Sequence, residues 1–166
     1  MTRFALLFST LLAGGLSLAA HATDFTQPKA GLHTGGQPSL EDLARLQSQG
    51  VRTVIDLRGA QEDRGYDAAA EARRLGMAYV ALPITGKDDI TPANARALQD
   101  LLNAQQGDVL LHCASGNRVG ALLALGAALD GTPQEDALTL GRAAGLTSLE
   151  PVVVERLAES GAAQPL

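Results

Sequence analysis

Short apolar runs and helical apolar patterns follow one another along most of the chain. The apolar runs predict three strands, at residues 51–57, 77–82 and 108–112. In the first run Val54 and Ile55 are adjacent, which is typical of a strand that is covered on both faces. Helical patterns separate these strands, and crossover connections of that kind build a parallel sheet. The sequence therefore predicts an α/β fold, a single domain with a mostly parallel central sheet flanked by helices.

Capping residues mark the ends of the predicted helices. Ser39 begins a pattern in which Leu40, Leu43 and Leu46 share one face, and Gly50 suits the left-handed position after its end. Further helices are predicted over residues 67–75 and 91–104, from residue 119, and after the capping boxes Thr132-Pro133-Gln134-Glu135 and Thr147-Ser148-Leu149-Glu150. No repeat or linker interrupts this series, so we expect one domain over residues 23–166.

The N-terminal segment has the pattern of a cleaved signal peptide. Arg3 supplies a positive start, residues 4–20 are almost wholly apolar or small, and Ala20-His21-Ala22 is a small-x-small cleavage site. The alternative is a retained anchor, but a run of about 17 residues is short for a bilayer about 30 Å thick. We therefore predict a signal peptide over residues 1–22, a periplasmic or secreted domain, and no stable membrane insertion after cleavage.

Composition and charge narrow the functional classes. The 166 residues carry a formal net charge of -5, and only 3% of them are aromatic. Nucleic-acid binding is therefore unexpected, since it needs a basic face or stacking rings. The chain has one cysteine, which excludes an internal disulfide and a zinc site made of several cysteines.

That cysteine lies in a loop between a predicted strand and a predicted helix. Ligands of an open parallel sheet bind beyond the carboxyl ends of its strands, which selects the loops that start at Arg58, at Thr85 and at Cys113. At the start of a helix, Cys113 would face unpaired backbone N–H groups and the positive end of the helix dipole, which favour the thiolate. Arg118, one turn further on, adds a full positive charge.

The same loop has the features of an oxyanion site. The backbone N–H groups of Ala114, Ser115, Gly116 and Asn117 can surround an anion, and Gly116 supplies the conformational freedom that such a loop needs. The planar guanidinium of Arg118 can bind two oxygens of a phosphoryl group. His112 is expected to support the loop from behind and to help hold the thiolate.

These residues resemble a known family. The run His112-Cys113-Ala114-Ser115-Gly116-Asn117-Arg118 resembles the signature of cysteine-dependent protein tyrosine and dual-specificity phosphatases. The segments Gly35-Gly36-Gln37-Pro38-Ser39, Val54-Ile55-Asp56-Leu57-Arg58 and Leu82-Pro83-Ile84-Thr85-Gly86 resemble the bacterial beta-lactamase hydrolase-like branch. The resemblance implies a dual-specificity-phosphatase-like fold and a phosphocysteine mechanism acting on a phosphorylated small molecule or phosphoprotein. It implies neither a metal nor an organic cofactor.

One departure from the family pattern keeps other functions open. Phosphatases of this superfamily usually place five residues between the cysteine and the arginine, whereas here there are four, Ala114 to Asn117. A shorter loop is also typical of rhodanese-like sulfurtransferases, in which the cysteine, here Cys113, would carry a persulfide. A non-catalytic phosphate-binding module is the third hypothesis, and a buried, inert Cys113 is the remaining alternative.

The general acid and the supporting arginine each have two interpretations. The resembling phosphatases carry an aspartic acid on the loop before the cysteine loop, where this chain has Asp88 and Asp89. We favour Asp88 as the acid; alternatively both are surface carboxylates ahead of the Thr91 cap. Arg58 either adds positive potential to the site or pairs with a neighbouring carboxylate, Glu62 or Asp63, and the sequence favours the ion pair.

Overall fold

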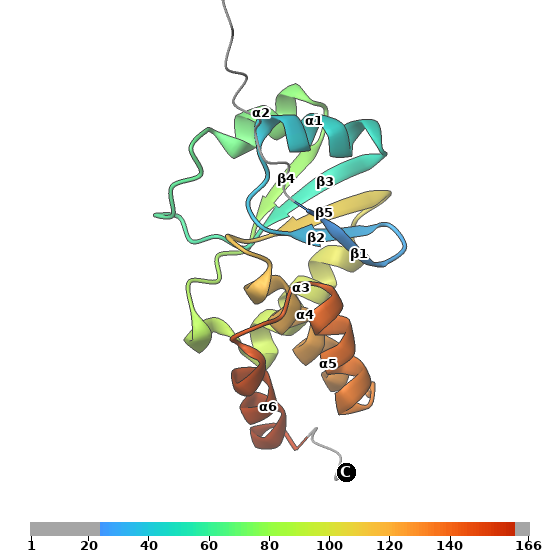
Figure 1. Ribbon diagram of the computed structural model, residues 1–166, viewed down its shortest axis with the longest axis vertical. Helices are drawn as coiled ribbons and strands as arrows, with labels where there is room; N and C mark the ends of the chain where they lie inside the picture. Colours follow the sequence, from blue (N-terminus) through green and yellow to red (C-terminus); the bar gives the residue numbers. More distant parts are fainter. Residues whose placement is uncertain (1–23, 162–166) are drawn as a thin grey trace, which may run out of the picture.

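A five-stranded sheet lies at the centre of the computed structural model, which describes residues 24–161 (Figure 1). The predicted signal peptide, residues 1–22, lies outside the described residues. The strand order is β1-β2-β5-β3-β4. The strands are β1 (Thr26–Lys29), β2 (Leu32–Gly35), β3 (Val51–Asp56), β4 (Ala78–Ala81) and β5 (Asp108–His112). β2, β5, β3 and β4 are parallel, and only β1 runs antiparallel to its neighbour, which confirms the predicted fold class.

Strand register brings the predicted functional loops to one edge of the sheet. His112, the last residue of β5, is level with Gly35 at the end of β2 and with Asp56 at the end of β3. Asp56 is in turn level with Ala81, the last residue of β4. The loops that follow these four strands therefore start side by side.

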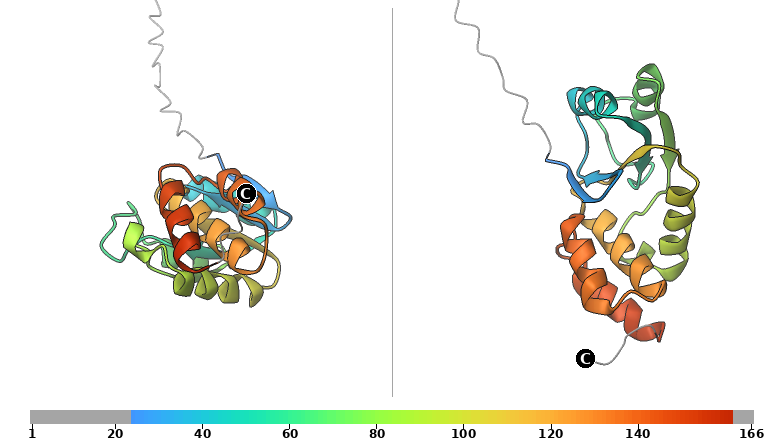
Figure 2. Two further views of the ribbon diagram at one scale, coloured as in Figure 1. Left: turned by 90° about the horizontal axis from the view of Figure 1, so that it is seen from below. Right: turned by 90° about the vertical axis from the view of Figure 1, so that its right-hand side faces the viewer.

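Helices cover both faces of the sheet (Figures 1 and 2). On one face lie α1 (Leu40–Ser48) and α2 (Ala68–Arg74). On the other lie α3 (Pro92–Asn103), α4 (Asn117–Leu129), α5 (Gln134–Ala143) and α6 (Glu150–Glu159). Adjacent strand residues serve opposite layers: Val54 and Leu110 pack in the core beneath α1 and α2, whereas Ile55 and Leu111 pack in the larger core with α3 to α6. This alternation explains the adjacent apolar pairs in the sequence.

Helix α4 follows the cysteine loop and is the most buried helix of the described chain. Nine of its residues are buried, as its uniformly apolar sequence predicts. A Cβ at Gly120 would overlap the backbone of Gly141 and Leu146, so the missing side chain lets α4 approach α5 closely. The cysteine loop is thus attached to a helix that is packed on several sides.

The predicted elements are confirmed with small shifts at their ends, and two features are wrong or missing. Strands β1 and β2 were not predicted, because they are short, polar and interrupted by turn residues. The two capping boxes are wrong. Neither α5 nor α6 has a side-chain cap, and both Glu135 and Glu150 bind the exposed Arg142 instead, at 2.7 and 2.6 Å. Among residues 24–161 no helix combines the length and the apolar character needed to cross a bilayer.

Candidate active site

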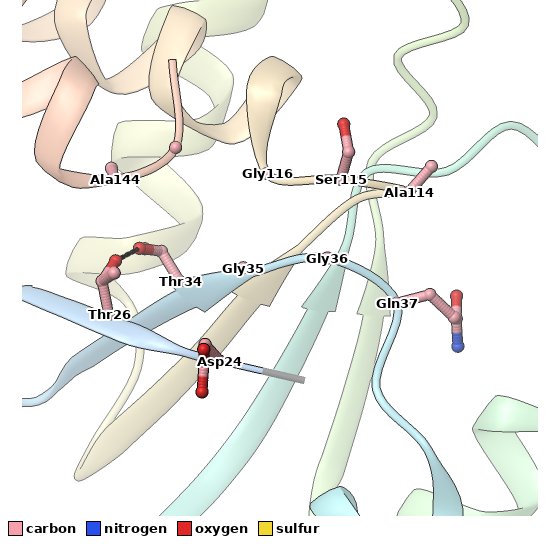
Figure 3. Close-up of a pocket in the computed structure, with 11 residues that line it drawn as sticks. Asp24, Thr26, Thr34, Gly35, Gly36, Gln37, Ala114, Ser115, Gly116 and Ala144 are labelled. Carbon is pink, nitrogen blue, oxygen red and sulfur yellow. Dashed lines mark hydrogen bonds between the residues drawn. The ribbon is translucent and has the colours of Figure 1, made fainter. Parts of the chain in front are cut away.

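The first half of the cysteine loop is held by the backbone of the segment after β2. The Cys113 N–H donates to the Gly35 carbonyl at 3.3 Å, and the Gln37 N–H donates to the Ala114 carbonyl at 3.2 Å. Gly36 and Ser115 form an isolated antiparallel bridge, and the two segments run side by side in Figure 3. A Cβ at Gly36 would lie 3.0 Å from the Ala114 carbonyl oxygen, a tight contact, so glycine favours this close approach.

Gly116 turns the loop into α4 and directs its own N–H at the sulfur. Its φ is +91°, in the left-handed region that favours glycine. Its N–H donates to Cys113 Sγ at 3.1 Å, so the thiol accepts a hydrogen bond from the residue that caps α4. A sulfur at a helix N-terminus with such a donor has the environment that favours a thiolate.

Cys113 is also fully buried, with 0% of its surface exposed. Burial is what we expect of an inert core cysteine. The hydrogen bond from the Gly116 N–H is what we expect of a nucleophile, and the structure has both features. A residue with no exposed surface cannot be reached by solvent or by a substrate while its surroundings keep this arrangement. We therefore expect side chains around the loop to shift when a substrate binds.

Arg118 turns its guanidinium toward the loop after β3. Its Nη1 donates to Glu62 Oε1 and to the Ile84 carbonyl, both at 2.5 Å, and its Nη2 donates to Glu62 Oε2 at 2.8 Å. The hydrogen bonds that Arg118 donates to Glu62 lower the pKa of Glu62 to about 2 and raise the pKa of Arg118. The sequence suggests Glu62 only as a partner of Arg58. Its contact with Arg118 joins residues that are 56 positions apart, and no sequence pattern indicates it.

Arg58 is paired, as the sequence favoured. Its Nε donates to Glu62 at 3.2 Å, its Nη2 to the backbone carbonyl of Asp63 at 2.7 Å, and its Nη1 to the Gln37 side chain at 2.5 Å. Glu62 therefore lies between two arginines, Arg58 and Arg118, one of which belongs to the cysteine loop.

His112 lies behind the loop, as expected, and is completely buried. Its Nδ1 is 3.4 Å from the Cys113 carbonyl oxygen. Its Nε2 is 3.9 Å from Asp56 Oδ1 and has no hydrogen-bond partner among the described residues. Burial lowers the pKa of His112, which favours the neutral imidazole, so its Nδ1–H can donate to the Cys113 carbonyl.

A buried carboxylate, Asp56, organises the polar layer beneath the loop. It accepts hydrogen bonds from the Arg58 N–H at 2.7 Å, from Arg64 Nε at 2.6 Å and from the Tyr79 hydroxyl at 2.7 Å. Burial by itself raises the pKa of Asp56, but nearby His112 and these donors outweigh burial and lower it. This cluster was not predicted, because its members come from separate strands and loops.

The two candidate acids occupy different environments in the loop after β4. Both belong to the 3₁₀ helix η1 (Lys87–Asp89). Asp89 accepts hydrogen bonds from the N–H and the hydroxyl of Thr85, each at 2.6 Å, and the hydroxyl and N–H lower its pKa. Asp88 is exposed to solvent. A carboxylate that accepts two hydrogen bonds and has a lowered pKa is a poor proton donor, so Asp88 stays the predicted acid.

The Asn117 side chain points to a different part of the molecule. Its Oδ1 accepts from the N–H groups of Thr147 and Leu149 at 2.9 and 3.3 Å, and its Nδ2 donates to Ser148 Oγ at 2.8 Å. It therefore links the start of α4 to the loop between α5 and α6. For anion binding, Asn117 has only its backbone N–H to offer.

A pocket of about 310 Å³ lies beside the loop (Figure 3). Gly35, Gly36, Ser115 and Gly116 are among its lining residues, whereas Cys113 and Arg118 are not. The pocket therefore borders three of the predicted anion-binding residues, Ala114, Ser115 and Gly116, without including the nucleophile or the arginine.

Known proteins resemble this chain in sequence. A family model described as "DSP-PTPase phosphatase fused to NAD+ Kinase" matches residues 17–137. Beta-lactamase hydrolase-like proteins are 38% identical over 119 residues in Xylella fastidiosa and 36% identical over 107 residues in Agrobacterium fabrum. These matches cover 69% and 62% of this chain but only 27% and 25% of the relatives, so the chain spans about a quarter of their length.

Solved phosphatase structures share the fold. A phosphatase-like protein of Neisseria meningitidis superposes with a TM-score of 0.69 at 22% identity, covering 81% of this chain and 96% of that one. TpbA of P. aeruginosa, solved in complex with pTyr, gives 0.60 at 20% identity, covering 87% of this chain and 99% of that one. The family match over residues 17–137 and the shared fold agree on the family of this chain. The chain belongs to the DSP-PTPase phosphatase family, together with the beta-lactamase hydrolase-like proteins.

Proposed function

We propose that this phosphatase-family protein hydrolyses phosphate monoesters, with Cys113 as the nucleophile and a phosphocysteine as the intermediate. The observation that carries the proposal is the hydrogen bond from the Gly116 N–H to Cys113 Sγ at the start of α4. It supports a thiolate at the same place where backbone N–H groups can bind the oxygens of a phosphoryl group. Arg118 follows within one helical turn and supplies the cation.

In the first step, the Cys113 thiolate attacks phosphorus and forms an S–P bond while the bond from phosphorus to the leaving oxygen breaks. Asp88, protonated beforehand, gives its proton to that oxygen, so an alcohol or phenol departs. The loop N–H groups and Arg118 stabilise the charge on the phosphoryl oxygens, which is the main electrostatic contribution in reactions of this kind.

In the second step, water attacks the phosphorus of the phosphocysteine and the S–P bond breaks. The Asp88 carboxylate accepts a proton from that water, inorganic phosphate leaves, and the thiolate of Cys113 is restored. Atoms and charges therefore balance over the cycle without a further reactant.

The substrate class follows from what the loop would bind, namely a phosphoryl group on a small molecule or a phosphoprotein. Its structural neighbour TpbA was solved with pTyr, which makes an aryl phosphate a reasonable first probe. We expect the wild-type protein to hydrolyse p-nitrophenyl phosphate, and the Cys113→Ser variant to be slower by about 10³-fold or more. Equal rates for the two proteins would contradict the proposal.

The leaving group tests the role of Asp88. Asp88→Asn should slow hydrolysis by about 10²-fold with phenyl phosphate, whose leaving oxygen needs a proton. The loss should be much smaller with p-nitrophenyl phosphate, because its leaving group departs readily as an anion. Asp89→Asn in the same loop is the matched control, and its loss should not depend on the leaving group. An equal loss of Asp88→Asn with both substrates would remove Asp88 from this role.

A sulfurtransferase is the second candidate, because only four residues separate Cys113 from Arg118. In that reaction, thiolate attack on thiosulfate breaks its S–S bond, releases sulfite and leaves a persulfide on Cys113. Cyanide then takes the outer sulfur as thiocyanate. Thiosulfate should add about 32 Da to Cys113 if this is the activity. If neither reaction occurs and calorimetry detects phosphate binding, the chain is a non-catalytic phosphate-binding module.

We also propose that the protein is exported, on the strength of the apolar residues 4–20 and the cleavage site Ala20-His21-Ala22. Expression of the full chain in a Gram-negative host, followed by N-terminal sequencing of the periplasmic fraction, tests this. A mature protein that starts at Thr23 supports export, and an uncleaved protein in the cytoplasm contradicts it.

A further inference from the structure

Three residues outside the cysteine loop connect its two ends. Gln37 binds the start of the loop through its backbone N–H, which donates to the Ala114 carbonyl at 3.2 Å. The Gln37 side chain accepts from Arg58, and Arg58 donates to Glu62 at 3.2 Å. Glu62 accepts two hydrogen bonds from Arg118, at the end of the loop. We call Gln37, Arg58 and Glu62 the three-residue bridge.

The contacts of Arg118 determine which of its donors remain for a substrate. A guanidinium has five N–H groups, two on each Nη and one on Nε. Both N–H groups of Nη1 are used, one by Glu62 and one by the Ile84 carbonyl, and one of the two on Nη2 is used by Glu62. The other pair, on Nε and Nη2, forms one edge of the fork, and the Arg118 side chain also interacts with that of Cys113. This edge suits two oxygens of a phosphoryl group.

We propose that the three-residue bridge positions Arg118, so that its Nε and Nη2 edge faces the substrate above Cys113. This inference rests on the proposed function and adds positioning residues to it. Backbone hydrogen bonds hold the start of the loop, and the three-residue bridge has the same role at its end. In a loop with only four residues between Cys113 and Arg118, the placement of the arginine then depends on Glu62.

A carboxylate on an arginine can also act as a competitor that a substrate anion must displace. The anchoring of Glu62 argues against that role. Besides Arg118, the Arg58 Nε and the Gly59 N–H both donate to its carboxylate, at 3.2 and 2.7 Å. The Arg118 hydrogen bonds keep the pKa of Glu62 at about 2, so the group is ionised at neutral pH. A carboxylate with donors from its own loop stays in place and orients the arginine.

A double-mutant cycle tests whether Glu62 acts through Arg118. Glu62→Gln keeps the shape of the side chain and removes its charge. We expect it to lower kcat/KM for p-nitrophenyl phosphate about tenfold and to weaken inhibition by orthovanadate to a similar extent. In an Arg118→Lys background, the same substitution should cause no further loss, because the group that Glu62 positions is gone.

Glu71→Gln is the matched control for Glu62→Gln. Glu71 also forms a two-pronged ion pair, at 2.6 and 2.8 Å, but on helix α2 and with the exposed Arg74 as its partner. This control should leave kcat/KM and orthovanadate inhibition unchanged. Thermal unfolding of each variant shows that the domain is folded, and Glu62→Asp should recover part of the lost activity.

Alkylation separates failure of this inference from failure of the proposed function. Cys113 is the only cysteine, so the iodoacetamide rate at a fixed pH reports one thiol whether or not phosphate esters are hydrolysed. Loss of the negative charge of Glu62 should by itself favour the thiolate and speed alkylation. Misplacement of Arg118 removes a stabilising cation and slows it, and we expect slower alkylation in Glu62→Gln.

The outcomes therefore have separate meanings. Slower alkylation in Glu62→Gln, with no hydrolysis even by the wild-type protein, supports the bridge and contradicts the phosphatase. Faster or unchanged alkylation, tighter orthovanadate inhibition, or equal losses in both arginine backgrounds would overturn the bridge, whatever the reaction.

Discussion

The two ends of the cysteine loop are held in different ways. At its start, backbone hydrogen bonds hold the loop: the Cys113 N–H donates to the Gly35 carbonyl, and the Ala114 carbonyl accepts from the Gln37 N–H. At its end, the contacts run through the Arg118 side chain, which donates to the Glu62 carboxylate and to the Ile84 carbonyl. A backbone contact persists through most substitutions, whereas an ion pair is lost when one side chain changes. The sulfur should therefore keep its place in variants that misplace the arginine.

The largest difference between the two ends should come from Arg118→Lys. Lysine keeps the charge but cannot form the two-pronged contacts that Glu62 and a phosphoryl group require. We expect kcat/KM to fall by about 10²-fold to 10³-fold, with little change in the melting temperature. Steady-state kinetics and calorimetry check this. A variant with near wild-type kcat/KM would show that only the charge of Arg118 matters.

The substitution Gly116→Ala should disturb the backbone geometry that holds Cys113. With φ at +91°, Gly116→Ala forces a side chain into the left-handed region, at a cost of about 1–2 kcal/mol. Because the Gly116 N–H donates to Cys113 Sγ, we also expect activity to fall by about tenfold or more. Chemical denaturation and p-nitrophenyl phosphate kinetics measure the two effects.

Gly131→Ala is the control for that substitution. Gly131 has nearly the same φ, +93°, and a Cβ there would meet nothing within 4 Å. The two variants should lose similar stability, but Gly131→Ala should keep its activity. If both variants lose activity equally, strain in the domain, and not the geometry of the loop, explains the loss.

The buried layer beneath the loop should respond more mildly. Tyr79→Phe removes the hydroxyl that donates to Asp56 at 2.7 Å. We expect a loss of about 1–3 kcal/mol in the free energy of unfolding, because the buried carboxylate loses a donor. Burial raises the pKa of Tyr79 to about 12, so the hydroxyl stays protonated and the effect should not vary between pH 6 and 9. An unchanged free energy of unfolding would mean that water replaces the hydroxyl.

The smallest effect is a difference in stability between wild type and Glu62→Gln, which we expect only in acid. The pKa of Glu62 is about 2 in the folded protein and 4.5 without its partners, so the unfolded chain binds the proton first as pH falls. The stability from this group is present above about pH 4.5 and is lost as pH falls through about 2. Wild type should therefore lose stability more steeply than Glu62→Gln over that range. Parallel curves would show that the ion pair adds nothing to folding.

The same contrast explains what could be predicted from the sequence. The strand that ends at His112, the glycine turn at Gly116 and the helix after it follow from local patterns, and the structure confirms them. Strand β2, which holds the start of the loop, is short and polar, so periodicity does not reveal it. The ion pair of Glu62 with Arg118 joins two separate loops, and no local pattern contains it.

The covalent group that Cys113 carries during turnover tests the proposed phosphocysteine intermediate most directly. Wild-type protein can be mixed with p-nitrophenyl phosphate, quenched in acid during turnover and digested for mass spectrometry. We predict a gain of about 80 Da, one phosphoryl group, on the peptide that contains Cys113. Steady release of p-nitrophenol with no such adduct, from a protein that gains about 32 Da with thiosulfate, would contradict a phosphocysteine intermediate.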